Sequence, residues 1–358
     1  MDPASPYKMD AHAIAYDLLE NRISAAIASA DPALFDALAL DVFHFQQAAN
    51  AAYRQYCQSL GITDPKHWRD IPPVPQAAFK LAALRSFPAE AESSAFHTSG
   101  TTGEGYGIHH FLSMRLYDEA IQRAWDLLNL PQLPQIILIP TPSDAPHSSL
   151  SHMMGVLKAR AKAGEQHWCV TRCNGLDTHR LDTALNNCRA SGQPVMLLGT
   201  ALAFLHWLEP ADHALSQLPP GSIVFETGGY KGSGRTLAKS DLYALLSNKL
   251  AIDPQDILNE YGMTELSSQC YTRGIGKPHV PPPWMRALVV DPATGCEVPD
   301  GETGLLRLHD LANLGSVMAI QTRDFATRRG SHFELLGRDP AALPRGCSRA
   351  ADEMLTTA

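Results

Sequence analysis

The sequence lacks the features that mark membrane proteins and nucleic-acid-binding proteins. Its 358 residues contain no long uninterrupted apolar run and no basic start followed by an apolar segment. We therefore expect no membrane span, no secretory signal and a cytoplasmic location. Charged residues make up only 18% of the chain and the formal net charge is −8, so the composition provides no basic footprint for nucleic acid.

A disulfide framework is also missing. The seven cysteines are odd in number and scattered along the chain, a pattern typical of reduced thiols. Cys169 and Cys173 lie close to His167, but no second ligand pair follows at the spacing of a zinc finger. These cysteines therefore predict ordinary thiols rather than a zinc site.

What the sequence does contain is a regular alternation of apolar runs and helical stretches. Hydrophobic residues make up 45% of the chain, enough for a substantial core. Short runs that are apolar on both faces are typical of parallel strands covered by helices. We predict an α/β body of helix-flanked, largely parallel strands. The expected strands lie at 136–139, 195–198, 223–225 and 257–258, and the expected helices at about 148–163, 177–191, 201–216 and 236–250.

The two ends of the chain show other patterns of apolar residues. Apolar residues at helical spacing predict a helix over 14–27, and a second helix is expected to start at Asp31 and Pro32 and run to Gly61. Past Pro283, short strands joined by turns predict a small β-rich subdomain. These strands are expected at 285–290, 304–308, 316–321 and 332–336. The predicted division is therefore a helical cover and α/β body over 1–284, the subdomain over 285–340 and a tail over 341–358.

Polar or glycine-rich residues directly follow the expected strands. They are Pro140-Thr141-Pro142, Gly199-Thr200, Glu226-Thr227-Gly228-Gly229 and Glu260-Tyr261-Gly262. Ligands of open α/β sheets gather beyond the carboxyl ends of the strands, so we expect these segments to converge on one crevice.

A glycine-rich loop is the most informative motif. Residues 98–107 combine four glycines with several hydroxyl side chains, so the backbone can bend sharply and present N–H groups to an anion. No lysine follows as in a P-loop, and no strand and helix frame the loop as in a dinucleotide fold. The composition is typical of a polyphosphate loop, and a flexible Gly/Thr turn is the alternative.

The remaining motifs follow in a fixed order. They are Glu226-Thr227-Gly228-Gly229, Asn259-Glu260-Tyr261-Gly262-Met263-Thr264-Glu265, Gln321-Thr322-Arg323-Asp324 and Phe333-x-x-x-Gly337-Arg338. Together with the glycine loop they resemble the successive motifs of the adenylate-forming superfamily. Over roughly residues 70–350 the chain most resembles the acyl-protein synthetases of the LuxE type, and more distantly the phenylacetate-CoA ligases. The phrase Arg345-Gly346-Cys347-Ser348 carries much of the closer match.

The resemblance implies that ATP and Mg²⁺ are bound. Thr264 would contact the α-phosphate, and Glu265 would hold Mg²⁺ through a hard oxygen ligand. The loop residues that would surround the phosphates are Thr98, Ser99, Gly100, Thr101, Thr102 and Gly103.

The same resemblance implies a site for the nucleoside. Asp324 would accept hydrogen bonds from the ribose hydroxyls, and Arg338 would lie near the ribose or a phosphate. Tyr261 would stack on the adenine ring. Three glycines would let the backbone approach the nucleotide closely, and they are Gly228, Gly229 and Gly262.

Two departures from the superfamily affect the catalytic lysine. Glu104-Gly105 replaces the Pro-Lys that usually follows the loop, and the chain is expected to lack the mobile C-terminal domain that carries a catalytic lysine. Lys231, just after the Gly228-Gly229 turn, is our first candidate to approach the phosphates. Lys80 is the second.

Three functions are compatible with this pattern. In the first, a fatty or other carboxylic acid is activated as acyl-AMP and passed to the thiol of Cys347, for delivery to a partner such as an acyl reductase. In the second, the acyl group goes instead to coenzyme A or a carrier protein. In the third, the chain is a non-catalytic nucleotide- or acyl-binding protein.

Overall fold

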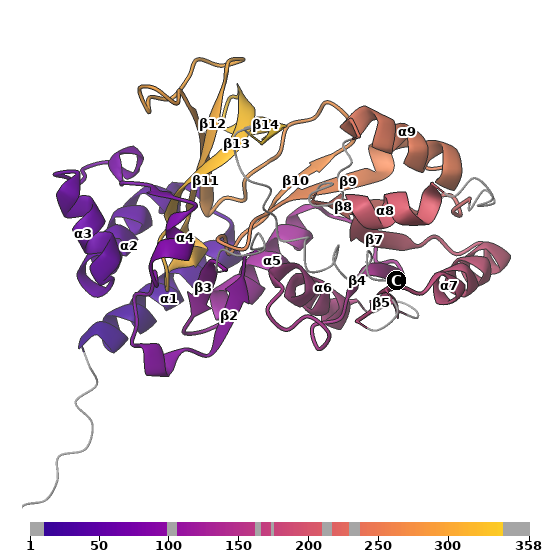
Figure 1. Ribbon diagram of the computed structural model, residues 1–358, viewed down its shortest axis with the longest axis horizontal. Coiled ribbons are helices and arrows are strands. Elements are labelled where there is room, and N and C mark those ends of the chain that lie inside the picture. Colours follow the sequence, from indigo (N-terminus) through magenta and orange to yellow (C-terminus); the bar gives the residue numbers. More distant parts are fainter. Residues whose placement is uncertain are drawn as a thin grey trace, which may run out of the picture.

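The computed structural model describes residues 11–98, 106–161, 166–172, 175–209, 217–228 and 237–338. Its centre is a seven-stranded sheet with the order β10-β9-β8-β7-β4-β5-β6 (Figure 1). The five inner strands are parallel, and the edge strands β6 and β10 are antiparallel to their neighbours. The strands are β4 (Gln135–Pro140), β5 (Gln166–Thr171), β6 (Gly175–Leu176), β7 (Met196–Thr200), β8 (Ile223–Thr227), β9 (Ile257–Tyr261) and β10 (Cys270–Arg273). The predicted α/β class is confirmed.

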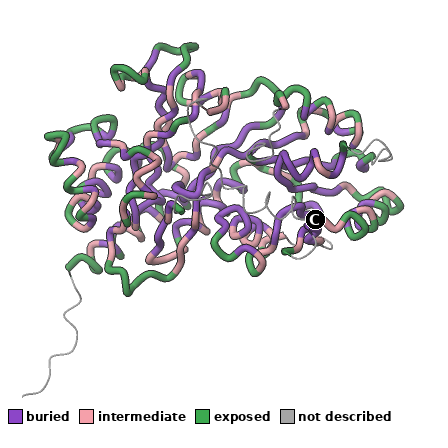
Figure 2. The backbone as a smooth tube through the Cα atoms, in the orientation of Figure 1, coloured by how far each residue is buried: buried purple, intermediate pink, exposed green. Residues whose placement is uncertain are grey.

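Helices cover both faces of this sheet. Ile137 and Ile139 of β4 pack with residues of α5 and α6, whereas Ile136 and Leu138 pack with residues of α7, α8 and α9. The alternation explains why the strand runs are apolar throughout, because neither face meets water. Figure 2 shows the buried backbone concentrated in these strands. The helices are α5 (Arg115–Leu127), α6 (Ser149–Arg160), α7 (Thr178–Ser191), α8 (Ala201–Leu208) and α9 (Lys239–Leu250).

Two differences from the predicted pattern have local causes. The helix expected over 201–216 ends at Leu208, and residues 210–216 lie outside the described part of the chain. The strand β5 was not predicted, because its apolar run is limited to Trp168, Cys169 and Val170 between polar residues.

A second sheet stands beside the first. It consists of β11 (Met285–Val290), β12 (Thr303–Asp310), β13 (Ala319–Arg329), β14 (His332–Arg338) and β1 (Val74–Pro75). All its pairings are antiparallel except β1 with β13. The strand expected over 316–321 instead begins at Ala319, because Ser316 closes a turn by donating its N–H to the Asn313 carbonyl at 3.0 Å. It then continues to Arg329.

Helices from the N-terminal part lie beside the second sheet (Figure 1). The helix expected from Asp31 to Gly61 is divided, because Asn50 adopts an extended conformation and its side chain accepts from the N–H of Tyr53 at 3.0 Å. Asp31 does cap the segment, accepting from the N–H of Ala33 at 2.9 Å. The elements are α1 (Ala11–Ser29), α2 (Phe35–Ala49), α3 (Ala51–Ser59), α4 (Ala78–Leu81), β2 (Ser94–His97) and β3 (Ile108–Phe111).

None of the helices within the described ranges is both long enough and apolar enough to cross a bilayer.

His309 of β12 provides a prediction about stability. Its side chain is fully buried against Trp68, and neither ring nitrogen has a hydrogen-bond partner among the described residues. Burial lowers the pKa of His309 to about 3. Because an unfolded histidine titrates near 6.5, the unfolded state binds an extra proton below that pH and the folded state loses stability. From pH 7.5 to pH 5, the wild type should lose about 2 kcal/mol more than His309→Leu.

Urea unfolding at the two pH values measures this difference. The matched control is His179→Leu, which changes an exposed histidine of α7 and should keep the wild-type pH dependence. Equal losses in the wild type and in His309→Leu would show that His309 does not carry the effect.

Candidate functional site

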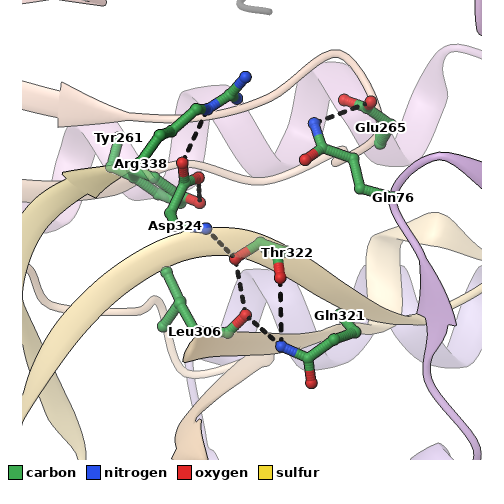
Figure 3. A network of polar contacts seen from close by, with 8 residues as sticks. All are labelled: Gln76, Tyr261, Glu265, Leu306, Gln321, Thr322, Asp324 and Arg338. Carbon is green, nitrogen blue, oxygen red and sulfur yellow. Dashed lines mark hydrogen bonds and ion pairs between the residues drawn. The ribbon is translucent and has the colours of Figure 1, made fainter. Parts of the chain in front are cut away.

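Three of the residues predicted to bind the nucleotide contact one another where the two sheets adjoin (Figure 3). Asp324 of β13 and Arg338 of β14 are direct partners in the antiparallel ladder. Arg338 Nε donates to Asp324 Oδ1 at 2.8 Å, and the hydroxyl of Tyr261 donates to Asp324 Oδ2 at 2.7 Å. The side chains of Asp324 and Arg338 are 6% and 16% exposed, so the pair is shielded from bulk water. The structure therefore presents a buried carboxylate with a guanidinium at its side.

Tyr261 is held from several directions. Its ring packs edge-on against Phe333 at 5.4 Å between centroids, and against His279 at 6.1 Å. Burial, together with the charge of Asp324, raises the pKa of Tyr261 well above its usual range. The phenol therefore stays protonated and acts as a donor to the carboxylate.

Thr322 fixes the backbone that carries Asp324. Its hydroxyl donates to the carbonyl of Leu306 at 2.7 Å and accepts from the N–H of Asp324 at 3.1 Å. The pairing of β12 with β13 shifts register between Leu305 and Arg307, so an irregular ladder adjoins the motif. The hydroxyl supplies contacts that a regular ladder would otherwise provide, and it keeps Asp324 in place.

Glu265 is anchored beside this cluster (Figure 3). Gln76 Nε2 donates to Glu265 Oε1 at 3.0 Å, and Asn313 Nδ2 donates to the Glu265 carbonyl at 2.9 Å. The pairing of β1 with β13 brings Gln76 there, and its N–H donates to the Gln321 carbonyl at 3.0 Å. Burial raises the pKa of Glu265 above its usual value, and the bond from Gln76 opposes that shift. A cation beside Glu265 would favour its ionised form.

Thr264 is positioned by a buried histidine. His109 Nδ1 lies 2.8 Å from the Thr264 carbonyl, and the imidazole packs against Phe79 and Phe111. Burial lowers the pKa of His109 to about 4, so the ring is neutral at physiological pH and Nδ1 donates to the carbonyl. The segment carrying Thr264 and Glu265 is thus fixed by contacts from three other parts of the chain.

Thr98 closes the base of the glycine loop. Its backbone N–H donates to the Gly107 carbonyl, and its Oγ1 accepts from the Gly107 N–H, both at 2.8 Å. A Cβ atom at Gly107 would lie 2.8 Å from Thr98 Oγ1 and 3.2 Å from Lys80 Cγ, so only glycine fits there and Lys80 lies beside the loop. The other predicted residues of the loop lie outside the described part of the chain, as do Gly229, Lys231 and Cys347.

A small cleft opens between helices α5 and α6 and the carboxyl ends of β8 and β9. Five residues of the predicted motifs line it, and they are Thr227, Gly228, Glu260, Gly262 and Met263. Of the four segments expected to converge on one crevice, the two that follow β8 and β9 therefore line this cleft. After β4, Thr141 accepts from the Asp144 N–H in a turn, and after β7, Thr200 caps α8 by accepting from the Ala203 N–H.

A buried polar network joins the ends of β8 and β9. Asn259 Nδ2 donates to Glu226 Oε1 at 2.7 Å, and the Tyr243 hydroxyl donates to the same oxygen at 3.1 Å. Lys239 Nζ donates to Asn259 Oδ1 at 2.8 Å. Burial raises the pKa of Glu226 and lowers that of Lys239, while each opposes the shift of the other by its charge. The network holds the two motif-bearing strand ends in register.

Sequence reasoning missed several residues of this site. Gln76 lies in a proline-rich segment, and its contact with Glu265 depends on the pairing of β1 with β13. His109, which contacts the Thr264 carbonyl, belongs to no motif. Glu260 was detectable, because it is an ionisable residue inside a quoted motif. It is 7% exposed, and burial raises its pKa to about 7. Among the described residues, no group of three or more His, Cys, Asp or Glu could hold a metal ion.

Comparisons with known proteins place the chain in a family. A family model described as acyl-protein synthetase, LuxE, matches residues 17–356. The chain is 22% identical over 339 residues to the "Long-chain-fatty-acid--luciferin-component ligase" of Vibrio harveyi, covering 88% of this chain and 85% of the relative. It is 24% identical over 306 residues to the protein of the same name from Aliivibrio fischeri, covering 81% and 78%.

Solved structures support the fold. ATP-bound MatB from Rhodopseudomonas palustris aligns with a TM-score of 0.51 at 15% identity, over 71% of this chain and 49% of MatB. The chain thus spans about half the length of that protein. 2-Hydroxyisobutyryl-CoA ligase, in complex with 2-HIB-AMP and CoA, aligns with a TM-score of 0.59 at 15% identity, over 94% of this chain and 72% of the ligase. At this identity the likeness establishes the architecture.

Proposed function

The chain belongs to the LuxE family of acyl-protein synthetases, and we propose that it uses ATP to convert a fatty acid into an acyl-adenylate and then an acyl thioester. The observation that carries this proposal is the family match together with the buried Tyr261–Asp324–Arg338 cluster beside Glu265. The names of the two relatives support a long-chain fatty acid as substrate.

In the proposed first step, a carboxylate oxygen of the acid attacks the α-phosphorus of ATP and pyrophosphate leaves. Such a reaction depends mainly on positioning and on neutralising charge. Asp324 would accept hydrogen bonds from the ribose hydroxyls, and Arg338 would offer its guanidinium to the ribose or a phosphate. Thr98 and Thr264 would donate to the phosphates. Gly228 and Gly262 would allow close approach of the nucleotide, with Tyr261 against the adenine.

Mg²⁺ suits the ligand set offered by Glu265. This ion is usually held by one or two carboxylates together with substrate phosphates, so a single buried acidic residue is sufficient. Gln76 donates to Glu265 Oε1 and fixes the position of the carboxylate. When bound, the ion would offset negative charge on the phosphates.

In the proposed second step, the thiolate of Cys347 attacks the acyl carbonyl, a thioester forms and AMP leaves. The acyl group would then pass to a partner such as an acyl reductase. Lys231 is proposed to approach the phosphates during the first step, with Lys80 as the second candidate. Coenzyme A or a carrier-protein thiol is the alternative acceptor.

Exchange of labelled pyrophosphate into ATP tests the proposed activity. Exchange should require Mg²⁺ and a carboxylic acid, and its rate should depend on which acid is supplied. A panel of fatty acids of increasing length, with no acid as the blank, identifies the substrate. Absence of exchange with every acid would favour the non-catalytic alternative.

The ribose contact yields a quantitative prediction. Asp324→Asn removes a charged acceptor, and a hydrogen bond to a charged group is typically worth about 1.5–3 kcal/mol. The dissociation constant of ATP should rise roughly tenfold to a hundredfold. The control is Tyr261→Phe, which removes the bond from the phenol to Asp324 but keeps the ring and the carboxylate. Titration calorimetry compares the two variants, and unchanged ATP affinity in Asp324→Asn would contradict the assignment.

A further inference from the structure

Glu265 is held at two points, and both contacts come from segments attached to strand β13. Gln76 Nε2 donates to Oε1 of its side chain at 3.0 Å (Figure 3). Asn313 Nδ2 donates to its backbone carbonyl at 2.9 Å. Gln76 directly follows β1, which pairs with β13, and Asn313 lies in the connection between β12 and β13. Because β13 also carries Asp324, Glu265 is tied twice to the strand of the predicted ribose acceptor.

The first contact comes from a segment whose backbone is fixed on both sides. The N–H of Gln76 donates to the Gln321 carbonyl of β13 at 3.0 Å, which extends the pairing of β1 with β13. A few residues earlier, the Tyr53 hydroxyl of α3 donates to the Pro72 carbonyl at 2.9 Å. The amide of Gln76 is therefore presented to Glu265 from a fixed backbone.

The second contact is part of a buried polar network. Asn313 is 1% exposed, and its carbonyl accepts from the side chain of Gln46 of α2 at 2.8 Å. In the same connection, Asp310 accepts from the N–H of Ser267 at 3.0 Å. Ser267 lies two residues beyond Glu265, so the connection holds the backbone of this segment at two neighbouring places.

These contacts matter because Glu265 lies outside any strand or helix. Residues 262–269 join β9 to β10 without regular structure. Tyr261 at the end of β9 is bonded directly to Asp324, but Glu265 lies four residues further along the chain. ATP bound with its metal would span Asp324 and Glu265, and a misplacement of about 1 Å can cost about a hundredfold in rate. The segment therefore needs its own link to β13.

We propose that Gln76 and Asn313 are positioning residues that hold the Mg²⁺ carboxylate of Glu265 in a fixed place relative to the ribose carboxylate of Asp324. This inference rests on the proposed adenylation activity and adds two residues that act through Glu265. Partners that orient a metal ligand typically contribute about tenfold to a hundredfold in metal affinity or activity. Their loss should weaken the metal site and slow the reaction, while ATP keeps its ribose contacts.

The first measurement does not depend on turnover. Mn²⁺ serves as a paramagnetic substitute for Mg²⁺, and the EPR signal of free Mn²⁺ gives its affinity for the protein–ATP complex. Gln76→Leu removes the donor at similar size and should weaken Mn²⁺ binding about tenfold. The dissociation constant of ATP without metal should stay within about twofold of the wild type, because Asp324 and Arg338 are unchanged.

The second measurement is acid-dependent pyrophosphate exchange. In Gln76→Leu, kcat should fall about tenfold or more with little change in the KM for ATP, because the lost interaction concerns alignment rather than binding. In a protein that already carries Glu265→Gln, the same substitution should have little further effect. Such a double-mutant cycle shows whether Gln76 acts through Glu265.

Ser86→Ala is the matched control. Ser86 is 3% exposed, and its hydroxyl donates to the Ser316 carbonyl at 3.1 Å, in the same connection that contains Asn313. The variant loses a buried hydrogen bond without changing a contact of Glu265, so Mn²⁺ affinity and kcat should match the wild type. Asn313→Ala should resemble Gln76→Leu. Urea unfolding compares the stability losses of Asn313→Ala and Ser86→Ala.

Three results would overturn the inference. One is wild-type Mn²⁺ affinity and kcat in both Gln76→Leu and Asn313→Ala. Another is an equal loss in Ser86→Ala, which would reduce the contacts to general stability. The third is a full additional loss from Gln76→Leu in the Glu265→Gln background. Absence of exchange in the wild type with every acid would instead overturn the proposed function, and the Mn²⁺ affinities would still decide the positioning role.

Discussion

Glu265→Gln is expected to slow acid-dependent pyrophosphate exchange about a hundredfold or more, while ATP binding changes much less. The amide has nearly the same shape as the carboxylate, and Gln76 can still donate to its remaining carbonyl oxygen. What the variant loses is the negative charge that would hold Mg²⁺. Charge on the phosphates grows as the bond to pyrophosphate breaks, so the loss falls mainly on the transition state.

The control for this variant is Glu226→Gln. Glu226 is also a buried glutamate at a strand end, but it accepts from Asn259 and Tyr243 on the side of α9. Its replacement should leave the Mg²⁺ requirement unchanged. Raising the Mg²⁺ concentration should partly restore exchange in Glu265→Gln. If the folded Glu265→Gln protein exchanges pyrophosphate at a near-normal rate without added Mg²⁺ beyond the usual concentration, Glu265 is not the Mg²⁺ ligand.

The strands and helices of the α/β body could largely be predicted, because their signals are local. A run such as residues 136–139 is apolar on both faces because helices cover both faces of β4. This burial requires apolar residues at consecutive positions, and such a run can be recognised in the sequence. The division at Asn50 was missed for a different reason. The Asn50 side chain caps a new helix by accepting from the Tyr53 N–H, and this bond competes with continuation of the preceding helix. The spacing of apolar residues does not show such a cap.

The motif residues of the site were predictable, but their supports were not. Asp324 and Arg338 stand in recognisable phrases, and the ladder of β13 and β14 brings them opposite each other. Gln76 reaches Glu265 from 189 positions earlier in the chain, through a two-residue strand that pairs with β13. Such a long-range contact leaves no local pattern. The same is true of His109 beneath Thr264.

Cys347→Ser should abolish a covalent acyl adduct while leaving pyrophosphate exchange intact. A thiol attacks as its thiolate, and a reference pKa near 8.5 leaves only a few per cent ionised at neutral pH, so a nucleophile benefits from nearby positive charge. Arg345 and Arg349 flank Cys347 in the sequence and bring that charge. Serine keeps the size of the side chain but is a much weaker nucleophile without an activating base.

The other cysteines provide the controls for this experiment. Cys57, Cys169 and Cys270 are buried, and burial raises the pKa of each thiol, for Cys169 to about 12, so they are poor nucleophiles. Cys296 is exposed in the described structure and is the matched control. Cys296→Ser should therefore retain the adduct in full.

The measurement is intact mass after incubation with ATP, Mg²⁺ and fatty acid, followed by hydroxylamine. A thioester adds the mass of the acyl group and is removed by hydroxylamine, whereas an amide on a lysine resists it. The wild type and Cys296→Ser should carry the labile adduct, and Cys347→Ser should not. If Cys347→Ser keeps the adduct, or if it acylates coenzyme A as fast as the wild type does, Cys347 is not the acceptor. The acyl group then leaves the enzyme on an external thiol, and the function is that of an acyl-CoA or carrier-protein ligase.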